Sequence, residues 1–286
     1  MSKGMSIENN SATRRRKTIA YIVLIFLTFL CLIWFLLLFL STTQAHSQLV
    51  QGFTIKLGGS FMSNLRKSMN SQNMLRGLLN SIIVSGSCAL LSTYFSTLTA
   101  YAIHAYDFKF KGAIFTFILA VMMIPSQVTI LGFVDLLDKL GLVENYTGLI
   151  VPSIAAPVVF YYIKQYMESA LPLSLVEAAR IDGSGEIRTF NFIVLPLMKP
   201  AIAVQAIFAF VAQWNNFFVP SQIIIENREL KTVALLIADL RSADFLNWDL
   251  GTVNMSIFVA IFPVIVIYLL LSKNIVGGLT MGSVKG

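Results

Sequence analysis

The hydrophobic pattern of this 286-residue chain consists of long stretches that contain no charged side chain. Because a helix needs about 20 apolar residues to cross the hydrocarbon core of a bilayer, each such stretch predicts one membrane-spanning helix. Six windows lack Asp, Glu, Lys and Arg, and the shortest of them has 19 residues. They are residues 18–55, 77–106, 112–134, 145–163, 200–225 and 250–272.

The most apolar part of each window locates the expected helix more closely. The first is interpreted as an uncleaved span, because its apolar run is longer than the ~7–15 residues of a signal-peptide core. The runs are continuous and do not alternate with polar residues, which excludes the strands of a transmembrane barrel. The sequence therefore predicts an all-α membrane protein with six transmembrane helices, at 18–40, 77–103, 112–134, 146–163, 201–223 and 250–272.

Composition agrees with a membrane protein and argues against a soluble one. Hydrophobic residues make up 56% of the chain and the mean hydropathy is +0.76. Charged residues make up 12%, about half the share found in an ordinary soluble domain. A chain with so few charges cannot cover its apolar surface in water, so the bilayer is its natural solvent.

The placement of basic residues predicts the orientation. Four consecutive basic residues, 14–17, directly precede the first span, which predicts a cytosolic N-terminus. With six spans, both termini are then cytosolic. On this topology the cytosolic segments hold 13 Lys/Arg against 6 Asp/Glu, and the external segments hold 8 against 8. The net charge of +7 therefore reflects membrane topology, and we expect no binding of nucleic acid.

Four regions are expected along the chain. Residues 1–17 form a disordered, polar, cytosolic tail. Residues 18–75 hold the first span and an external stretch rich in Ser, Gln and Asn. Residues 76–274 hold the other five spans and a long cytosolic segment at 164–199. Residues 275–286 form a second cytosolic tail. Prolines inside the spans predict kinks, either around a water-filled cavity or for packing alone.

The cytosolic segment 164–199 has the pattern of a helical hairpin. Ser174 and Glu177 have the spacing of a capping box, which predicts a helix that starts at Ser174. Gly183 can adopt a positive φ and end that helix, and a second short helix is expected from Ser184. Pro196 and Pro200 would then lead into the fifth span. These features alone fit an interfacial loop equally well.

The residue pattern in this hairpin resembles the EAA signature of ATP-binding-cassette importer permeases. Glu177-Ala178-Ala179 is followed after three residues by Gly183, and after nine more by Ile193-x-Leu195-Pro196. The segment also precedes the penultimate span, as in that family. Trp214-Asn-Asn-Phe217 and the C-terminal Gly278–Gly286 are similar to segments of the smaller maltose-type sugar permease. The similarity covers most of residues 77–286, whereas the external stretch 41–75 carries no recognisable motif.

The resemblance implies a type I importer permease fold, in the inner membrane of a bacterium, with both termini cytosolic. It implies a transport subunit without enzymatic activity, cofactor or metal, and the chain indeed has no G-x-x-x-x-G-K-[ST] phosphate loop. The implied partners are a second homologous permease subunit, a dimer of ATPase subunits and an extracytoplasmic solute-binding protein. The residues that would couple to the ATPase are Glu177, Ala178, Ala179, Gly183, Ile193, Leu195 and Pro196.

Several polar residues in the apolar windows are candidates for contact with a sugar. An indole face and amide groups suit a ligand with apolar C–H faces and many hydroxyls. Packing or gating would explain the same residues, so both interpretations stay open. The candidates are Trp214, Asn215, Asn216, Gln213 and Gln127.

Three alternatives bear on function. A glycerol-phosphate-type substrate fits the same permease family. An ion-coupled carrier usually needs ionisable residues within its spans, and none lies in the six windows. A membrane-embedded enzyme is disfavoured because the chain has no H-E-x-x-H, no G-x-S-x-G and no carboxylate pair at bilayer depth.

Overall fold

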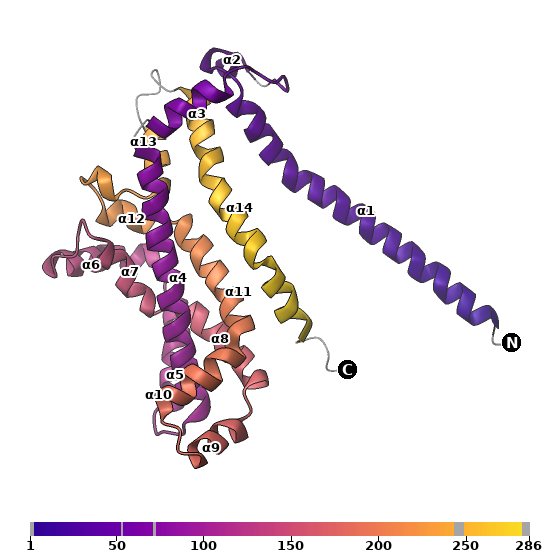
Figure 1. The fold of residues 1–286 in the computed structure, drawn as a ribbon, viewed down its shortest axis with the longest axis vertical. Coiled ribbons are helices and arrows are strands. Elements are labelled where there is room, and N and C mark those ends of the chain that lie inside the picture. The colour runs from indigo at the N-terminus through magenta and orange to yellow at the C-terminus, as the bar shows by residue number, and fades with distance from the viewer. Residues whose placement is uncertain (1–2, 53, 71–72, 243–248, 282–286) are drawn as a thin grey trace. The chain divides into compact units, whose positions relative to one another are not determined.

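The computed structural model describes residues 3–52, 54–70, 73–242 and 249–281, and over these ranges it contains helices and loops but no strand (Figure 1). The chain divides into two compact units. The first comprises residues 1–68 and 246–258, and the second comprises residues 69–245 and 259–286. The all-α fold class is therefore confirmed.

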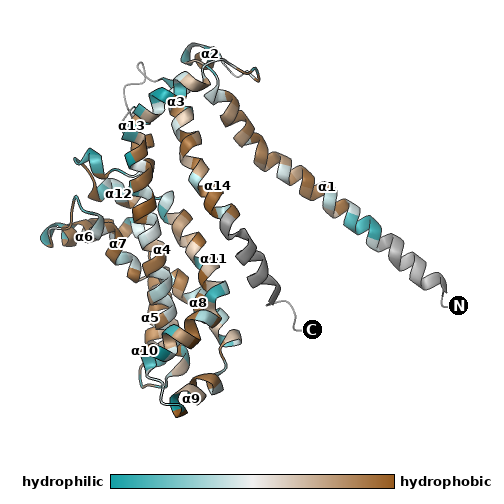
Figure 2. Ribbon diagram, viewed as in Figure 1, coloured by the Kyte–Doolittle hydropathy of each residue, from teal (hydrophilic) through white to brown (hydrophobic). Residues whose placement is uncertain are grey.

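The first unit contains α1 (Lys3–Thr42), α2 (His46–Val50), most of α3 (Phe61–Asn70) and the start of α14 (Leu250–Met281). Figure 2 shows that α1 is hydrophobic along most of its length. The expectation of a disordered tail over residues 1–17 is wrong from Lys3 onward, because α1 already begins there. Extending an existing helix avoids the cost of nucleation, so the apolar span can carry the polar residues before it in helical form.

The external stretch 41–70 folds back on the start of α14 through polar contacts. The Asn64 amide donates to the carbonyls of Thr42 and Gln44, both at 2.8 Å. Lys67 pairs with Asp249 at 2.7 Å. Gly251 lies so close that a Cβ there would come within 2.8 Å of the Gln44 carbonyl oxygen. This stretch, for which the sequence offered no motif, is thus held in place by hydrogen bonds to backbone groups.

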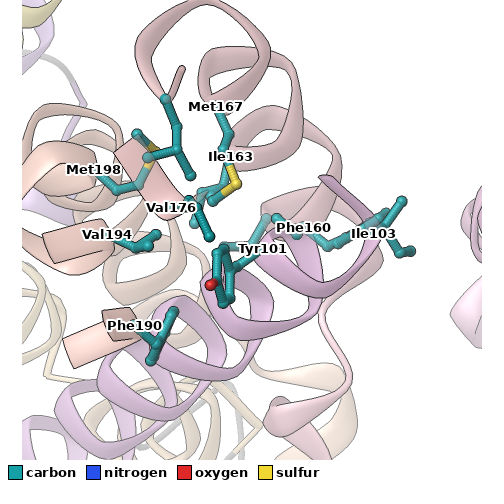
Figure 3. Close-up of a cluster of buried hydrophobic side chains, with 12 residues drawn as sticks. Tyr101, Ile103, Phe160, Ile163, Met167, Val176, Phe190, Val194 and Met198 are labelled. Carbon is teal, nitrogen blue, oxygen red and sulfur yellow. The ribbon is translucent and has the colours of Figure 1, made fainter. Parts of the chain in front are cut away.

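The second unit is organised around α4 (Met74–Ala105), which packs against α8 (Pro157–Ala170) and α11 (Leu195–Trp214) (Figure 1). Figure 3 shows the apolar cluster where these three helices meet the helix α9 (Leu173–Ile181). The labelled members are all buried and are Tyr101, Ile103, Phe160, Ile163, Met167, Val176, Phe190, Val194 and Met198.

Within the described residues, five helical segments are long and apolar enough to cross a membrane, and a bent pair supplies a sixth candidate span. The bent pair is α5 (Lys111–Met122) and α6 (Ser126–Lys139), which differ in direction by 102°. The third span, expected at 112–134 with a kink at its proline, corresponds to this bent pair, which extends to Lys139. Pro125 lies at the break, has no N–H to donate and keeps the preceding residue out of the helical region.

The fourth span is also interrupted. It consists of α7 (Tyr146–Ile150), the 3₁₀ turn η2 (Val151–Ile154) and α8, and it extends to Ala170. Pro152 and Pro157 each stand in the first turn of the element that they begin. The prolines thus mark the starts of new helical pieces, as their missing N–H permits.

The fifth span lies further toward the N-terminus than the expected 201–223. It starts at Glu186 and comprises α10 (Glu186–Thr189), the π-helical turn η3 (Phe190–Val194) and α11, which ends at Trp214. Absence of charge was a misleading criterion here, because the first turns of this helix carry charged side chains. The chain continues with α12 (Phe218–Ile223), the 3₁₀ turn η4 (Arg228–Leu230) and α13 (Val233–Ser242).

Candidate functional site

The hairpin expected from the sequence consists of α9 and α10, joined by residues 182–185. Gly183 has φ +78°, which confirms the expected positive φ. Its N–H donates to the Arg180 carbonyl at 3.0 Å, and the Ser184 N–H donates to the Ala179 carbonyl at 2.9 Å. These two bonds form a Schellman motif, which satisfies carbonyls at the end of α9 and reverses the chain.

The start of the hairpin differs from the expectation. Helix α9 begins at Leu173 after Pro172, and no side chain caps its N-terminus. The capping box of Ser174 and Glu177 is therefore wrong. Pro172, with φ −64° and ψ 131°, already sets the entry into the helix. The second helix likewise begins at Glu186, after Gly185, and not at Ser184.

The two faces of α9 differ in their surroundings. Val176 and Ala179 are buried, and Val176 belongs to the apolar cluster of Figure 3. Glu177 and Ala178 are exposed, and the Ile181 side chain is 86% exposed at the end of the helix. Of the two alanines in the proposed coupling set, only Ala178 lies on the outer surface, since Ala179 packs inward.

The structure separates the seven proposed coupling residues into two groups. Glu177, Ala178, Ala179 and Gly183 lie in the hairpin. The other three lie in the following helix, where Ile193 and Leu195 are half-buried and Pro196 is exposed. The π-helical turn η3 directly precedes Leu195 and Pro196, so the helix changes its hydrogen-bond spacing just before a residue that has no N–H to donate.

A polar cluster, which was not predicted from the sequence, lies between the hairpin and the end of α4. It consists of Tyr101, Tyr106, Arg180 and Glu186. The Arg180 Nε donates to Glu186 Oε1 at 3.0 Å, and the Tyr101 hydroxyl donates to Glu186 Oε2 at 3.2 Å. The Arg180 guanidinium also lies over the Tyr106 ring, 4.9 Å from its centroid. Partial burial raises the pKa of Tyr106, and a hydrogen bond with Glu186 raises it further. Opposite charges six residues apart across a glycine turn were the signal available in the sequence.

The π-helical turn η3 is held to α4 by side chains. The Asn191 amide donates to the Ile187 carbonyl at 2.8 Å, and the Tyr94 hydroxyl donates to Asn191 Oδ1 at 3.3 Å. The buried Phe190 ring packs edge-on against Tyr94, with ring centroids 5.5 Å apart. The hairpin and the helix that follows it are therefore both connected to α4.

The candidate sugar contact Trp214 has a packing role in the structure. It is 3% exposed, and its ring stacks on Phe210 with centroids 5.6 Å apart. Its indole N–H donates to the Ala260 carbonyl of α14 at 3.2 Å. An indole whose only donor is already used inside the protein holds α11 and α14 together, and this favours the packing interpretation over ligand contact.

The remaining sugar candidates are more accessible. Asn215 and Gln127 are exposed, and Gln213 is half-buried. Asn216 has a local structural role, because its side-chain Oδ1 accepts the Val219 N–H at the start of α12 and its side-chain NH₂ donates to Gln213 Oε1.

Glu144 is a further functional-looking residue that the sequence did not single out. Its backbone has φ +55°, and its carboxylate accepts the N–H groups of Ile225, Glu226 and Asn227 at 2.6, 2.7 and 3.2 Å. Partial burial acts to raise the pKa of Glu144, but these three N–H donors outweigh it and the pKa is lowered. Glu144 thus fixes the loop after α12 to the loop before α7.

The comparisons with known proteins agree with this geometry. The family model described as "Binding-protein-dependent transport system inner membrane component" matches residues 92–275, a range that includes the hairpin. The arabinooligosaccharides transport system permease protein AraQ of Bacillus subtilis is 37% identical over 207 residues, which cover 72% of each chain. The sn-glycerol-3-phosphate transport system permease protein UgpE of Shigella flexneri is 31% identical and covers 73% of this chain and 74% of its own.

A solved structure has the same fold. It is the crystal structure of a bacterial ABC transporter involved in the import of the acidic polysaccharide alginate. One of its chains matches with a TM-score of 0.77 at 20% identity, and the match covers 92% of this chain and 97% of that chain. At this identity the likeness concerns the fold.

Proposed function

Because the chain belongs to the family of binding-protein-dependent transport system inner membrane components, we propose that it forms half of the path through which an ATP-driven importer moves a sugar or oligosaccharide. Members of this family are transport subunits, so the chain is a multi-pass membrane protein and no enzyme. The coupling to ATP hydrolysis then has to pass through a surface that another subunit can reach.

The observation that carries the proposal is the hairpin of α9 and α10. It is a short helix closed by a Schellman turn at Gly183, with its inner face packed in the core and its outer face exposed. Exposed apolar groups beside charged ones suit a protein partner. Ile181 of α9 and Ile187 of α10 are 86% and 78% exposed, and the exposed Glu177 lies on α9. We propose that this face docks on the separate ATPase subunit, on the cytosolic side.

The proposed assembly contains this chain, a second homologous permease subunit, a dimer of ATPase subunits and a solute-binding protein outside the membrane. The orientation with both termini cytosolic goes with it, because the basic residues 14–17 precede the first span. Residues 282–286 of the C-terminal motif lie outside the described residues.

The substrate class is proposed from chemistry and from similarity together. The accessible candidates Asn215, Gln213 and Gln127 carry neutral amides, which suit hydroxyl groups. A phosphate-bearing substrate would favour cationic groups instead. The relative named for arabino-oligosaccharides is 37% identical, against 31% for the relative named for glycerol 3-phosphate. We therefore favour a sugar and keep glycerol 3-phosphate as the second candidate.

The test is transport by the reconstituted complex. The chain is co-expressed with candidate permease, ATPase and binding-protein partners from the same organism, and the complex is placed in proteoliposomes that contain ATP. We expect ATP-dependent uptake of a labelled oligosaccharide, such as an arabino-oligosaccharide, and none without the ATPase. Uptake of glycerol 3-phosphate with no uptake of any oligosaccharide would select the second candidate. Solute uptake that follows an ion gradient without ATP would refute the importer assignment.

A further inference from the structure

The polar cluster behind the hairpin joins three elements that differ in sequence position. Arg180 lies near the end of α9, and Glu186 is the first residue of α10. Tyr101 comes from the last turns of α4, and Tyr106 directly follows that helix. Both carboxylate oxygens of Glu186 are used, one by Arg180 and the other by Tyr101. The cluster thus bridges the two ends of the Gly183 turn and connects them to α4.

The exposure of the ion pair argues against a role in stability alone. The Arg180 and Glu186 side chains are 37% and 48% exposed, and ion pairs as exposed as this contribute little to folding. The aromatic side of the cluster is different, because Tyr101 is 2% exposed and packs against the buried Phe190 ring at 5.8 Å. The buried Tyr101 therefore holds the orientation of the exposed Arg180–Glu186 ion pair.

The position of Glu186 gives the cluster a mechanical consequence. Glu186 begins the candidate span Glu186–Trp214, and Tyr101 belongs to the candidate span Met74–Ala105. Among the described residues, α9 itself is otherwise attached to the core through small or apolar side chains such as Val176 and Ala179. One further hydrogen bond, from the His104 ring of α4 to the Leu171 carbonyl at 3.0 Å, holds the chain just before α9 and lies on the far side from Arg180 in sequence. Apolar packing resists separation but constrains sliding less than directional hydrogen bonds do.

We propose that Tyr101, Tyr106, Arg180 and Glu186 are positioning residues that make the hairpin and α4 move as one body, so that displacement of the hairpin is transmitted to the span. This inference rests on the proposed function, and it adds how the motion enters the membrane. The residues need not touch the ATPase or the sugar. Loss of the cluster leaves docking in place but allows the hairpin to move without the span.

The test uses the reconstituted complex and three conservative variants. Tyr101→Phe removes one hydroxyl and keeps the buried ring. Glu186→Gln removes the charge and keeps the shape. Arg180→Lys keeps the charge but loses the planar group above Tyr106. We expect wild-type retention of the ATPase subunit, unchanged basal ATP hydrolysis and a fall of about fivefold or more in sugar transported per ATP hydrolysed.

Matched controls separate the cluster from general perturbation. Tyr162→Phe makes the same chemical change at a tyrosine that is 55% exposed. Asp135→Asn makes a similar change at an ion pair with Lys139, whose side chains are 69% and 63% exposed. Both controls should keep the wild-type ratio of sugar to ATP. The double variant Tyr101→Phe, Glu186→Gln should be no worse than the poorer single variant, because the hydroxyl that Tyr101→Phe removes acts only through Glu186.

The outcomes are distinct. Wild-type sugar-to-ATP ratios in Tyr101→Phe and Glu186→Gln would overturn the inference. Loss of the ATPase subunit from these variants would also overturn it, because the cluster would then be part of the docking surface. Failure of the proposed function would show itself earlier, as a wild-type complex without ATP-dependent uptake. Uncoupled hydrolysis confined to the cluster variants, with both controls coupled, would support the inference.

Discussion

The two ends of the fifth span differ in what their sequence motifs do. At the Glu186 end, the EAA-like residues Glu177 and Ala178 are exposed on a hairpin whose attachment is made by other residues. At the Trp214 end, the most prominent residue of the motif is itself buried and is used to attach α14. The residues of a recognisable motif can therefore be exposed for contact with a partner, or they can be buried and hold helices of the same chain together. Burial and hydrogen bonding decide which, and neither can be read from the motif.

The strongest expected effect in this comparison is at Gly183. A β-branched residue is strained at φ +78°, at a cost of about 1–3 kcal/mol, although no atom lies within 4 Å of the position of a Cβ. Gly183→Val should therefore abolish uptake, because it strains the backbone of the turn and not because it clashes with a neighbour. The protein should still insert in the membrane. Uptake and retention of the ATPase subunit are the measurements.

Two further variants sharpen that result. Gly183→Asn should keep much of the uptake, because asparagine tolerates a positive φ. Gly132→Val, at another position with open space but no positive φ, should behave as wild type. Equal uptake in Gly183→Val and wild type would show that the hairpin conformation is unimportant for transport.

The next effect concerns the other end of the span. Trp214→Ala should destabilise the protein by about 3–5 kcal/mol, because it removes a large buried ring and leaves the Ala260 carbonyl without its donor. We expect reduced yield and loss of assembly, measured by size-exclusion chromatography of the complex in detergent. An assembled, stable complex that lacks uptake alone would instead make Trp214 a sugar contact.

A smaller effect is expected at Asn215, which is exposed beside Trp214. Asn215→Ala should leave assembly and basal ATP hydrolysis intact and weaken uptake severalfold, by the ~0.5–1.5 kcal/mol of one neutral hydrogen bond. The concentration dependence of uptake is the measurement. Unchanged uptake would remove Asn215 from the candidate sugar contacts.

The smallest expected effect is at Glu144. Because its pKa is lowered in the folded protein, its stabilisation is complete above the ordinary pKa of glutamate, about 4.3, and is lost as the pH falls through the lowered value. Glu144→Gln should therefore lower thermal stability at pH 7 by an amount that shrinks on acidification. A difference from wild type that stays constant down to pH 3 would contradict this role.

The sequence predicts the membrane class and the glycine of the hairpin, because both depend on local properties. Charge-free windows indicate the spans, although they misplace the start of the fifth, and the left-handed turn at Gly183 favours a residue without a Cβ. Prediction from the sequence fails where a segment has more than one plausible local structure and packing selects between them. Ser174 had the pattern of a cap, but Pro172 already defines the start of α9. Ala179 turns inward because α9 has to cover the core.

The cluster at Glu186 was missed for a related reason. Tyr101 and Glu186 are 85 residues apart in sequence, and a tyrosine in an apolar window gives no sign of its partner. The break at Pro125 was partly foreseen as a kink, but its angle of 102° depends on how α5 and α6 pack. Contacts between distant segments are thus the part of the site that only the structure supplies.

The most direct test of the central claim is cross-linking between the hairpin and the ATPase subunit. Ile181→Cys, at the 86% exposed end of α9, is introduced together with Cys31→Ser and Cys88→Ala. A short reagent with one thiol-reactive and one photoreactive end, which needs no thiol on the partner, is applied to the assembled complex in inside-out vesicles. The account predicts a cross-linked product with the ATPase subunit, and none from Asp138→Cys on the exposed surface of α6. A product from position 138 and none from position 181 would contradict both the docking surface and the orientation.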